Sequence, residues 1–168
     1  KPKRVAAVVT HYTHNSHADV IVSRILQGYN LDHKPPFPKL ELVSLYTDQV
    51  PLNDMSRELS KKHGFPIVST IAHGLTLGSS KLAVDGVLLI GEHGNYPLSE
   101  TGQIAYPRRR FFEETAAVFE SVGKVIPVFS DKHLSWNWKD AEWMYRRAKL
   151  LGIPFMAGSS VPGTWRHP

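Results

Sequence analysis

Three histidines follow the first apolar run of the chain and are spaced three residues apart: His11, His14 and His17. On one face of a helix, two imidazoles at this spacing could bind a metal such as zinc. At the N-terminus of a helix, histidines, hydroxyls and backbone amides could instead hold a phosphate or a carboxylate. A polar turn without a ligand is the third interpretation. No acidic residue is firmly placed beside the histidines, so we assign no metal site, and the interpretations stay open.

Two further polar groups follow later apolar runs. Glu92 and His93 come directly after the run that ends at Ile90, and a Glu–His pair at such a place could carry out acid–base chemistry. Lys132 and His133 follow the run that ends at Phe129 and have a similar status. We predict Lys132, His133 and His93 as the catalytic candidates. The alternative is that these side chains lie in solvated loops.

Three consecutive arginines, Arg108 to Arg110, begin a segment with helical spacing. Cations in the first turn oppose the helix macrodipole, each by about 0.3 kcal/mol or more. Glu113 and Glu114 offset part of this cost. An anionic ligand or partner would account for the arrangement, and solvated arginines paired with nearby glutamates are the alternative.

The apolar pattern predicts alternating strands and helices. The runs lack strict alternation, which is typical of parallel strands buried on both faces. The expected strands are Val5–Val9, Leu40–Tyr46, Ile67–Val68, Val84–Ile90, Val125–Phe129 and Ile153–Ala157. The expected helices are Ser16–Tyr29, a short helix from Asn53 to Gly64, a weak turn over Thr70–Leu77, Arg108–Val122, and a helix from Ser135 or Asn137 to Gly152. A loop of unusual length, Gly91–Pro107, separates two of these elements and is of the kind that often carries function.

Alternating strands and helices predict an α/β fold: a three-layer, doubly wound parallel sheet of the Rossmann type, with strand order 3-2-1-4-5-6. Such sheets bind ligands beyond the carboxyl ends of the strands, at the switch between strands one and four. The segments expected there are Thr10–His17, Tyr46–Asp48, Gly91–Tyr96 and Ser130–His133.

Composition limits the class of protein. A chain of 168 residues with 42% hydrophobic and 21% charged residues fits one globular domain. No apolar run reaches the roughly 18 to 20 residues that span a bilayer, and no signal peptide is visible, so we expect no membrane partner. The net charge of +5 lies in short clusters without an aromatic–basic pattern, so we expect no nucleic-acid partner. The chain has no cysteine, which leaves the cellular location undecided.

Four segments carry a family resemblance: Glu41–Leu45, Val84–Ile90, Lys124–Lys132 and Ala148–Gly158. They resemble the second strand, the fourth strand, the strand leading to a Glu-Lys-Pro motif, and the last helix and strand of the N-terminal domain in the glucose-fructose oxidoreductase / inositol dehydrogenase / MocA family. Trp165–Pro168 resembles the crossing into the second, substrate-binding domain of that family. The resemblance therefore implies that residues 1–168 are one Rossmann-like domain and the N-terminal part of a longer two-domain protein.

The resemblance also implies a cofactor, NAD(P), and a set of site residues. The family opens with Gly-x-Gly-x-x-Gly, and the matching positions here are Thr10, Tyr12 and Asn15. Since no glycine is present, we expect the Tyr12 ring to occupy the space of a phosphate. The acidic ribose-binding position falls near Thr47, with Asp48 the nearest carboxylate. The predicted cofactor-binding residues are Thr10, His11, Tyr12, His14, Asn15, Asp48, Glu92 and Asp131.

Within the Glu-Lys-Pro motif, Asp131 and Lys132 match in character, while His133 replaces proline. The resemblance implies that Lys132 assists hydride and proton transfer.

Three functions compete at this stage. The first is an oxidoreductase-like domain with a degraded NAD(P) fingerprint, related to sugars or polyols. The second is a non-redox Rossmann-like domain that binds another anion or serves as a docking scaffold. The third is a histidine-based, metal-dependent lyase or hydrolase. The expected partners are a small-molecule ligand or anion, a C-terminal substrate domain, and a second copy of the chain in a homo-oligomer. Trp136, Trp138 and Trp143 would suit such an interface.

Overall fold

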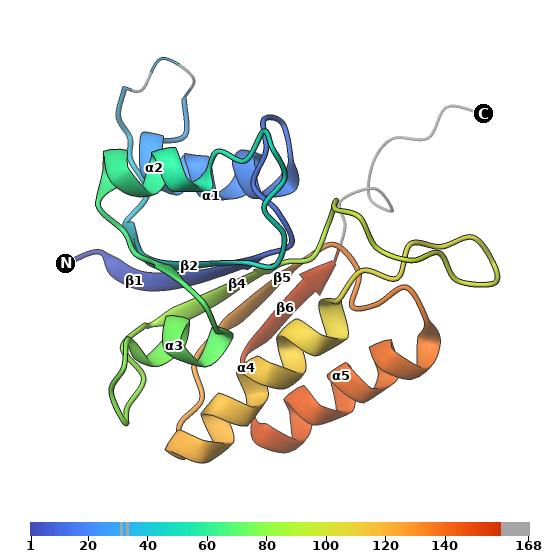
Figure 1. Cartoon of the computed structure of the whole chain (residues 1–168). Coiled ribbons are helices and arrows are strands. Elements are labelled where there is room, and N and C mark those ends of the chain that lie inside the picture. Colours follow the sequence, from blue (N-terminus) through green and yellow to red (C-terminus); the bar gives the residue numbers. More distant parts are fainter. Residues whose placement is uncertain (31, 33, 159–168) are drawn as a thin grey trace.

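The computed structural model describes residues 1–30, 32 and 34–158, and the predicted crossing at Trp165–Pro168 lies outside them. Six parallel strands form one sheet in the order β3-β2-β1-β4-β5-β6, which confirms the predicted fold (Figure 1). The strands are β1 (Lys3–Val9), β2 (Leu40–Thr47), β3 (Ile67–Val68), β4 (Gly86–Ile90), β5 (Val128–Asp131) and β6 (Phe155–Gly158).

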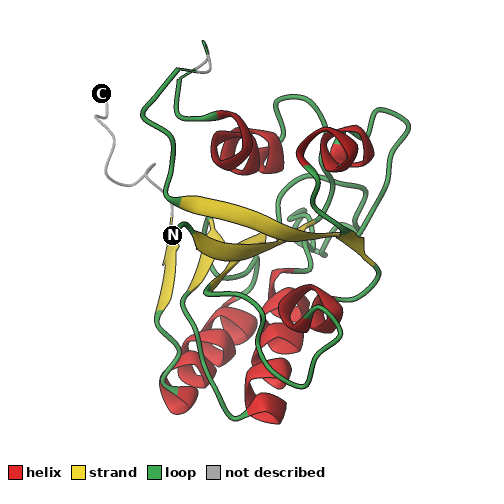
Figure 2. Ribbon diagram, turned by 90° about the vertical axis from the view of Figure 1, so that its left-hand side faces the viewer, coloured by secondary structure: helices red, strands yellow, loops and turns green. Residues whose placement is uncertain are grey.

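Helices cover both faces of the sheet and complete the three layers (Figure 2). The helices α1 (His17–Gln27) and α2 (Ser56–His63) lie on one face, and α3 (Ile71–Thr76), α4 (Arg108–Val122) and α5 (Trp138–Leu151) lie on the other. No helix in the part of the chain that is described is long and apolar enough to cross a membrane.

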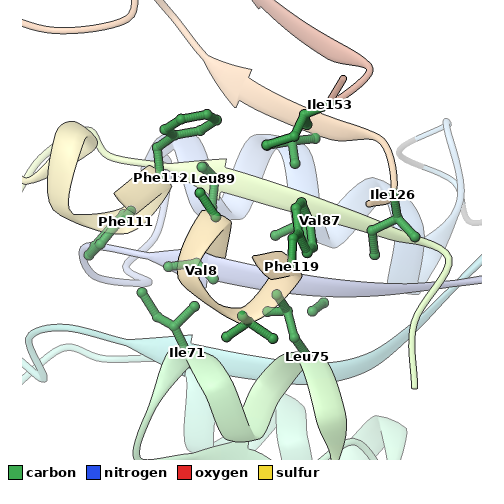
Figure 3. Close-up of a cluster of buried hydrophobic side chains, with 14 of the residues drawn as sticks. Val8, Ile71, Leu75, Val87, Leu89, Phe111, Phe112, Phe119, Ile126 and Ile153 are labelled. Atoms are coloured by element: carbon green, nitrogen blue, oxygen red, sulfur yellow. The ribbon is translucent and has the colours of Figure 1, made fainter. Parts of the chain in front are cut away.

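Each face of the sheet has its own apolar core. On the side of α3, α4 and α5, three phenylalanines of α4 pack onto β1 and β4 (Figure 3): Phe111, Phe112 and Phe119. The opposite core lies under α1 and α2 and includes Val22, Leu45 and the ring of Tyr12. The central strands contribute side chains to both cores and are therefore buried on both faces. This explains the continuous apolar runs in the sequence.

Capping residues set most helix boundaries. Ser16 and Asn137 accept hydrogen bonds from the first-turn amides of Asp19 and Asp140 and so cap α1 and α5. For α5 this selects Asn137 over Ser135, the two residues at which the helix was expected to start. The helix expected from Asn53 starts later, because α2 begins at Ser56 after Met55.

Prolines delay the start of two strands. We expected strands from Val125 and Ile153, but β5 begins at Val128 and β6 at Phe155. Pro127 and Pro154 directly precede these strands and have no N–H to donate to a ladder. Their carbonyl groups still accept from the amides of Val87 and Val128, at 3.0 and 2.9 Å. The sheet therefore starts pairing at these carbonyls.

Candidate functional site

The carboxyl ends of β1, β2 and β4 are tied together at the switch point of the sheet. The Thr10 amide donates to the Ile90 carbonyl at 3.1 Å, and the Thr10 hydroxyl donates to the Glu92 carbonyl at 2.5 Å. The Asp48 amide donates to the Val9 carbonyl at 2.9 Å. The segments after the three strands therefore lie beside one another, as the sequence predicted.

The turn from β1 into α1 contains no glycine, yet one residue takes a left-handed conformation. This residue is Asn15, with φ of 59°, at the position that matches the third glycine of the family motif. Asparagine is one of the few non-glycine residues that adopt this conformation at low cost. The Asn15 amide donates to the Asp19 carboxylate at 2.9 Å, and Ser16 then caps α1. Asn15 thus supplies the positive φ at the glycine-matching position.

The ring of Tyr12 packs into the core under α1. Its side chain is fully buried in the core under α1, and its hydroxyl forms a hydrogen bond of 2.7 Å with the Ser23 hydroxyl. Its carbonyl accepts from the Met55 amide at 2.8 Å. Burial is the main reason that the pKa of Tyr12 rises above its ordinary value. The expectation that this ring fills the space of a phosphate is therefore wrong.

Three of the site histidines gather with one carboxylate, and we call this group the histidine cluster: His11, His17, His93 and Asp131. The His17 Nδ1 atom donates to Asp131 Oδ2 at 2.5 Å, a contact between α1 and the end of β5. The His93 ring meets the His17 ring edge-on at 5.1 Å and stacks with the His11 ring at 5.8 Å. His14 stands apart, because its exposed ring lies 3.7 Å from Asp19.

Burial lowers the pKa of two histidines in the histidine cluster. The pKa values of His11 and His93 are lowered by burial first and then by a neighbouring histidine, His93 and His17 respectively. The His11 Nε2 and His93 Nδ1 atoms are buried and have no hydrogen-bond partner in the described structure. His93 and Lys132 both have a positive φ, at 67° and 69°. Strained residues of this kind tend to collect at functional sites.

Within the described residues, no group of three or more His, Asp or Glu side chains is arranged to hold a metal ion. Lys132 lies close enough to His93 for its charge to act on that ring. The structure thus brings Lys132, His93 and Asp131 to one place.

Arg108 is a buried arginine at the start of α4, beside the histidine cluster. It forms an ion pair with Glu92, and its Nη1 atom donates to His133 Nε2 at 3.3 Å. Gly91 makes room for it, since a Cβ at that position would lie 2.7 Å from Arg108 Cγ. Burial and then the charge of Arg108 lower the pKa of His133.

A pocket of about 430 Å³ opens beside Arg108. It is lined by Glu92, Gln103, Ile104, Tyr106, Arg108, His133, Ser135 and Trp136.

The other two arginines of this run also have carboxylate partners, Asp140 for Arg109 and Asp48 for Arg110. Arg109 and Arg110 also lie 3.7 and 3.1 Å from Glu113 and Glu114, the glutamates that were expected as partners. Arg108 departs from the expected solvated run because it is buried.

Asp48, the predicted ribose-binding carboxylate, is engaged within the chain. It accepts hydrogen bonds from Arg110 and from the hydroxyls of Tyr46 and Tyr96, at 2.8 and 2.7 Å for the tyrosines. Burial raises the pKa of Asp48, but these three hydrogen bonds outweigh it and lower the pKa below its ordinary value. Because Tyr96 belongs to the loop 91–107, Asp48 fastens this loop over the end of β2.

Sequence reasoning missed one residue at the end of β2. Arg57, in the first turn of α2, donates from Nη1 to the Thr47 hydroxyl at 2.9 Å. The signal was present, since Arg57 stands in the first turn of the helix that follows the second strand. Sequence reasoning also did not pair His17 with Asp131, which are 114 residues apart.

Acid is expected to destabilise the fold through three histidines of the candidate site: His11, His93 and His133. The folded chain lowers the pKa of His11, His93 and His133 below 6.5, so the unfolded chain binds more protons between the lowered values and 6.5. The free energy of unfolding should therefore fall as pH falls through that window. Urea titrations between about pH 5 and about pH 7.5 measure this slope.

The variant His11→Gln/His93→Gln should flatten the pH dependence. His14→Gln, at an exposed position of the same turn, is the matched control for the loss of a histidine. A slope in the double variant equal to that of the unmodified chain would contradict the prediction.

Three solved structures that share this architecture are a reductase, a dehydrogenase and a protein in complex with NAD. One is biliverdin reductase from Synechocystis sp. PCC 6803, in complex with biliverdin and NADP+, with a TM-score of 0.54 at 15% identity over 94% of this chain and 38% of its own. Another is myo-inositol 2-dehydrogenase from Lactobacillus plantarum, with a TM-score of 0.58 at 14% identity over 94% and 36% of the two chains. A third is GenD2 from gentamicin A biosynthesis in complex with NAD, with a TM-score of 0.56 at 14% identity over 94% and 34%.

The chain shares their fold. The chain spans little more than a third of the length of the solved structures that it matches. No family model matches the chain, and no curated protein is similar to it in sequence.

Proposed function

We propose that the chain is the nucleotide-binding domain of an NAD(P)-dependent oxidoreductase of the glucose-fructose oxidoreductase / inositol dehydrogenase / MocA type. The observation that carries the proposal is the gathering of His17, His93, Asp131 and Lys132 at the switch point of a 3-2-1-4-5-6 sheet. Dinucleotides bind at that point in this fold. A sugar or polyol is the substrate class that we propose for the full-length protein.

The residues of the β1–α1 turn fit a pyrophosphate. Asn15 supplies the positive φ, and the Tyr12 ring lies in the core under α1. His14, Asn15 and the start of α1 would hold the phosphates through polar side chains and the helix dipole. Thr10 would not take part, because it is fully buried and donates from both its amide and its hydroxyl within the chain. When bound, the nicotinamide supplies the group that accepts or donates a hydride.

Lys132 and the pair His17–Asp131 would serve proton transfer in this proposal. The Asp131 carboxylate accepts from His17 Nδ1 and so fixes the orientation of the ring, which leaves Nε2 to take up a proton. His93 and Lys132 lie beside this pair. The space for the substrate would include the pocket next to Arg108, which Glu92 and His133 line. His11 would border this space through its contact with His93. A second, substrate-binding domain would close the site from the other side.

Calorimetric titration of the purified chain with NADH and NADPH tests the proposal. We expect saturable binding of at least one cofactor at micromolar to millimolar concentration. Tripolyphosphate is the control ligand, since a chain of net charge +5 could attract any polyanion. No binding of either cofactor at millimolar concentration, or equal binding of tripolyphosphate, would contradict the proposal.

One observation favours a second candidate, a non-redox domain for another anion. Asp48 is already engaged by Arg110, Tyr46 and Tyr96, so ribose hydroxyls would have to compete with these partners. In this case the same titration should show binding of a simple anion and none of the cofactors.

A further inference from the structure

We propose that two copies of the chain associate through α5, with the two helices antiparallel across a twofold axis. The inference concerns the outer surface of one helix and does not depend on nucleotide binding. It rests on three features of α5: the spacing of its exposed side chains, the order of their charges, and two hollows beside them.

The first feature is a row of side chains along the outer face of α5, which we call the α5 seam. Its members are spaced four, three and four residues apart: Trp138, Glu142, Tyr145 and Lys149. This is the spacing with which one helix packs against another in coiled coils. The seam is open to solvent, since Trp138 is 77% and Tyr145 52% exposed.

The position of α5 in the fold leaves the seam facing outward. The helix lies at the outer edge of its layer, beside α4 (Figure 1). Met144 and Ala148, on its inner side, are buried in the core that α4 shares. Because aromatic side chains dominate the energetics of interfaces, a seam with two of them exposed to solvent indicates an intermolecular partner.

The second feature is the order of residues along the seam, which is complementary to itself in one orientation. When two copies of α5 run antiparallel about the midpoint of the seam, Trp138 lies opposite Lys149, and Glu142 lies opposite Tyr145. Each contact then occurs twice. The ammonium over the indole is a cation–π contact, and the tyrosine hydroxyl can donate to the carboxylate.

The parallel orientation is disfavoured by the same residues. It would set Glu142 against Glu142 and Lys149 against Lys149, and like charges in contact oppose association. Arg146 holds the Glu142 carboxylate in place through a hydrogen bond of 2.7 Å from Nη2 to Oε1. The seam therefore fits a second copy of itself in the antiparallel orientation.

The third feature is a pair of hollows that flank Tyr145. One, of about 490 Å³, lies beside Trp138 and Ala141, and the other, of about 360 Å³, lies beside Lys149 and Phe155. Since Trp138 lies opposite Lys149 in the antiparallel pair, the indole of each copy enters the hollow next to Lys149 of the other. Helices with this spacing pack in the same way, each knob entering a hole on the facing surface.

The dimer is expected to be weak, because the interface is small. With 14 residues, α5 is about 21 Å long. A single pair of helices of this length buries less than the roughly 1,600 Å² of a standard interface and falls into the range of transient complexes. We therefore expect a Kd of about 10–100 µM.

Sedimentation velocity of the full chain between about 5 and about 500 µM tests the proposal, since this range brackets the expected Kd. The average mass should rise from that of a monomer toward that of a dimer. Trp138→Ala should raise the Kd at least about tenfold, because a tryptophan anchored in a pocket carries much of the energy of an interface. Val20→Ala is the matched control, since Val20 is an exposed apolar residue of α1 on the opposite face of the sheet.

Two charge reversals test the pairing of the seam. Glu142→Lys leaves only cations in the seam and Lys149→Glu leaves only anions, so each variant alone should stay monomeric. An equimolar mixture of the two should associate, because the opposite charges then meet. Thermal unfolding of each variant shows that the fold is retained.

Cross-linking tests the orientation, and the chain has no cysteine of its own that would interfere. A short bismaleimide should join Glu142→Cys chains, because this position lies near the twofold axis. Lys149→Cys chains should not be joined, since the antiparallel pair separates these positions by roughly 16 Å along the helix axis.

Three results would overturn the inference: a chain that is still monomeric at about 500 µM, a dimer that Trp138→Ala leaves intact, or cross-linking of Lys149→Cys as readily as Glu142→Cys. The last would indicate a parallel pair. None of these measurements involves a cofactor, so their outcome leaves the proposed function unchanged.

Discussion

Replacing Arg108 by methionine is expected to lower the free energy of unfolding by about 3–5 kcal/mol. The Arg108 side chain is 3% exposed, and its guanidinium neutralises Glu92 and donates to His133. Methionine fills much of the volume but provides no charge, so the Glu92 carboxylate is left partly buried without its partner. Removing one member of a buried pair costs far more than the pair contributes, because the remaining charge keeps its desolvation penalty.

Urea unfolding of the two proteins at neutral pH measures the effect of Arg108→Met. Arg146→Met is the matched control, since its ion pair with Glu142 is exposed and should contribute less than about 0.5 kcal/mol. The double variant Arg108→Met/Glu92→Gln should recover part of the loss, because it removes the uncompensated charge. A loss for Arg108→Met as small as that of the control would show that Arg108 is not buried against Glu92.

Replacing Tyr12 by alanine is expected to cost about 3–5 kcal/mol of stability without improving the binding of a dinucleotide. The Tyr12 ring is fully buried in the core under α1, so its removal leaves a cavity between α1, α2 and the sheet. If the ring instead filled the space of the pyrophosphate, the same change would leave stability nearly unaltered and tighten cofactor binding. Denaturant unfolding and calorimetry on one sample separate the two arrangements.

Tyr12→Phe is the matched control, because it keeps the ring and removes only the hydroxyl. The hydrogen bond to Ser23 is lost, while Ser23 keeps its bond of 2.6 Å to Asp19. A cost of about 1 kcal/mol is therefore expected. Should Tyr12→Ala prove as stable as Tyr12→Phe, the ring would not lie in the core.

Local patterns determined the elements of the fold well. The helix Arg108–Val122 was predicted to the residue, because its apolar stripes begin after Pro107 and Gly123 ends it in a left-handed conformation. The strand starts at Val128 and Phe155 were missed, since an apolar run does not show where a proline removes the ladder donor.

The polar segments that the sequence placed at one edge of the sheet do meet there, but most of their contacts were not predicted. Apolar runs followed by Glu92 and by Asp131 placed these residues at the carboxyl ends of strands, where the structure has them. Which residues pair was not predictable, since Asp48 meets Arg110 across 62 residues of chain and His17 meets Asp131 across 114. Asp48 is the clearest case, because its type suggested a ribose ligand while the structure uses it to fasten a loop.

By itself the sequence determined the α/β class and the strand order. The periodicity of apolar residues and the handedness of crossover connections are sufficient for these, because both are local or general rules. Only the tertiary structure decided that Tyr12 turns into the core, that Asn15 takes the left-handed turn, and that Arg57 stands at Thr47. The direction of a side chain depends on the neighbours that the fold brings to it from distant parts of the chain, and the residue type does not contain that information.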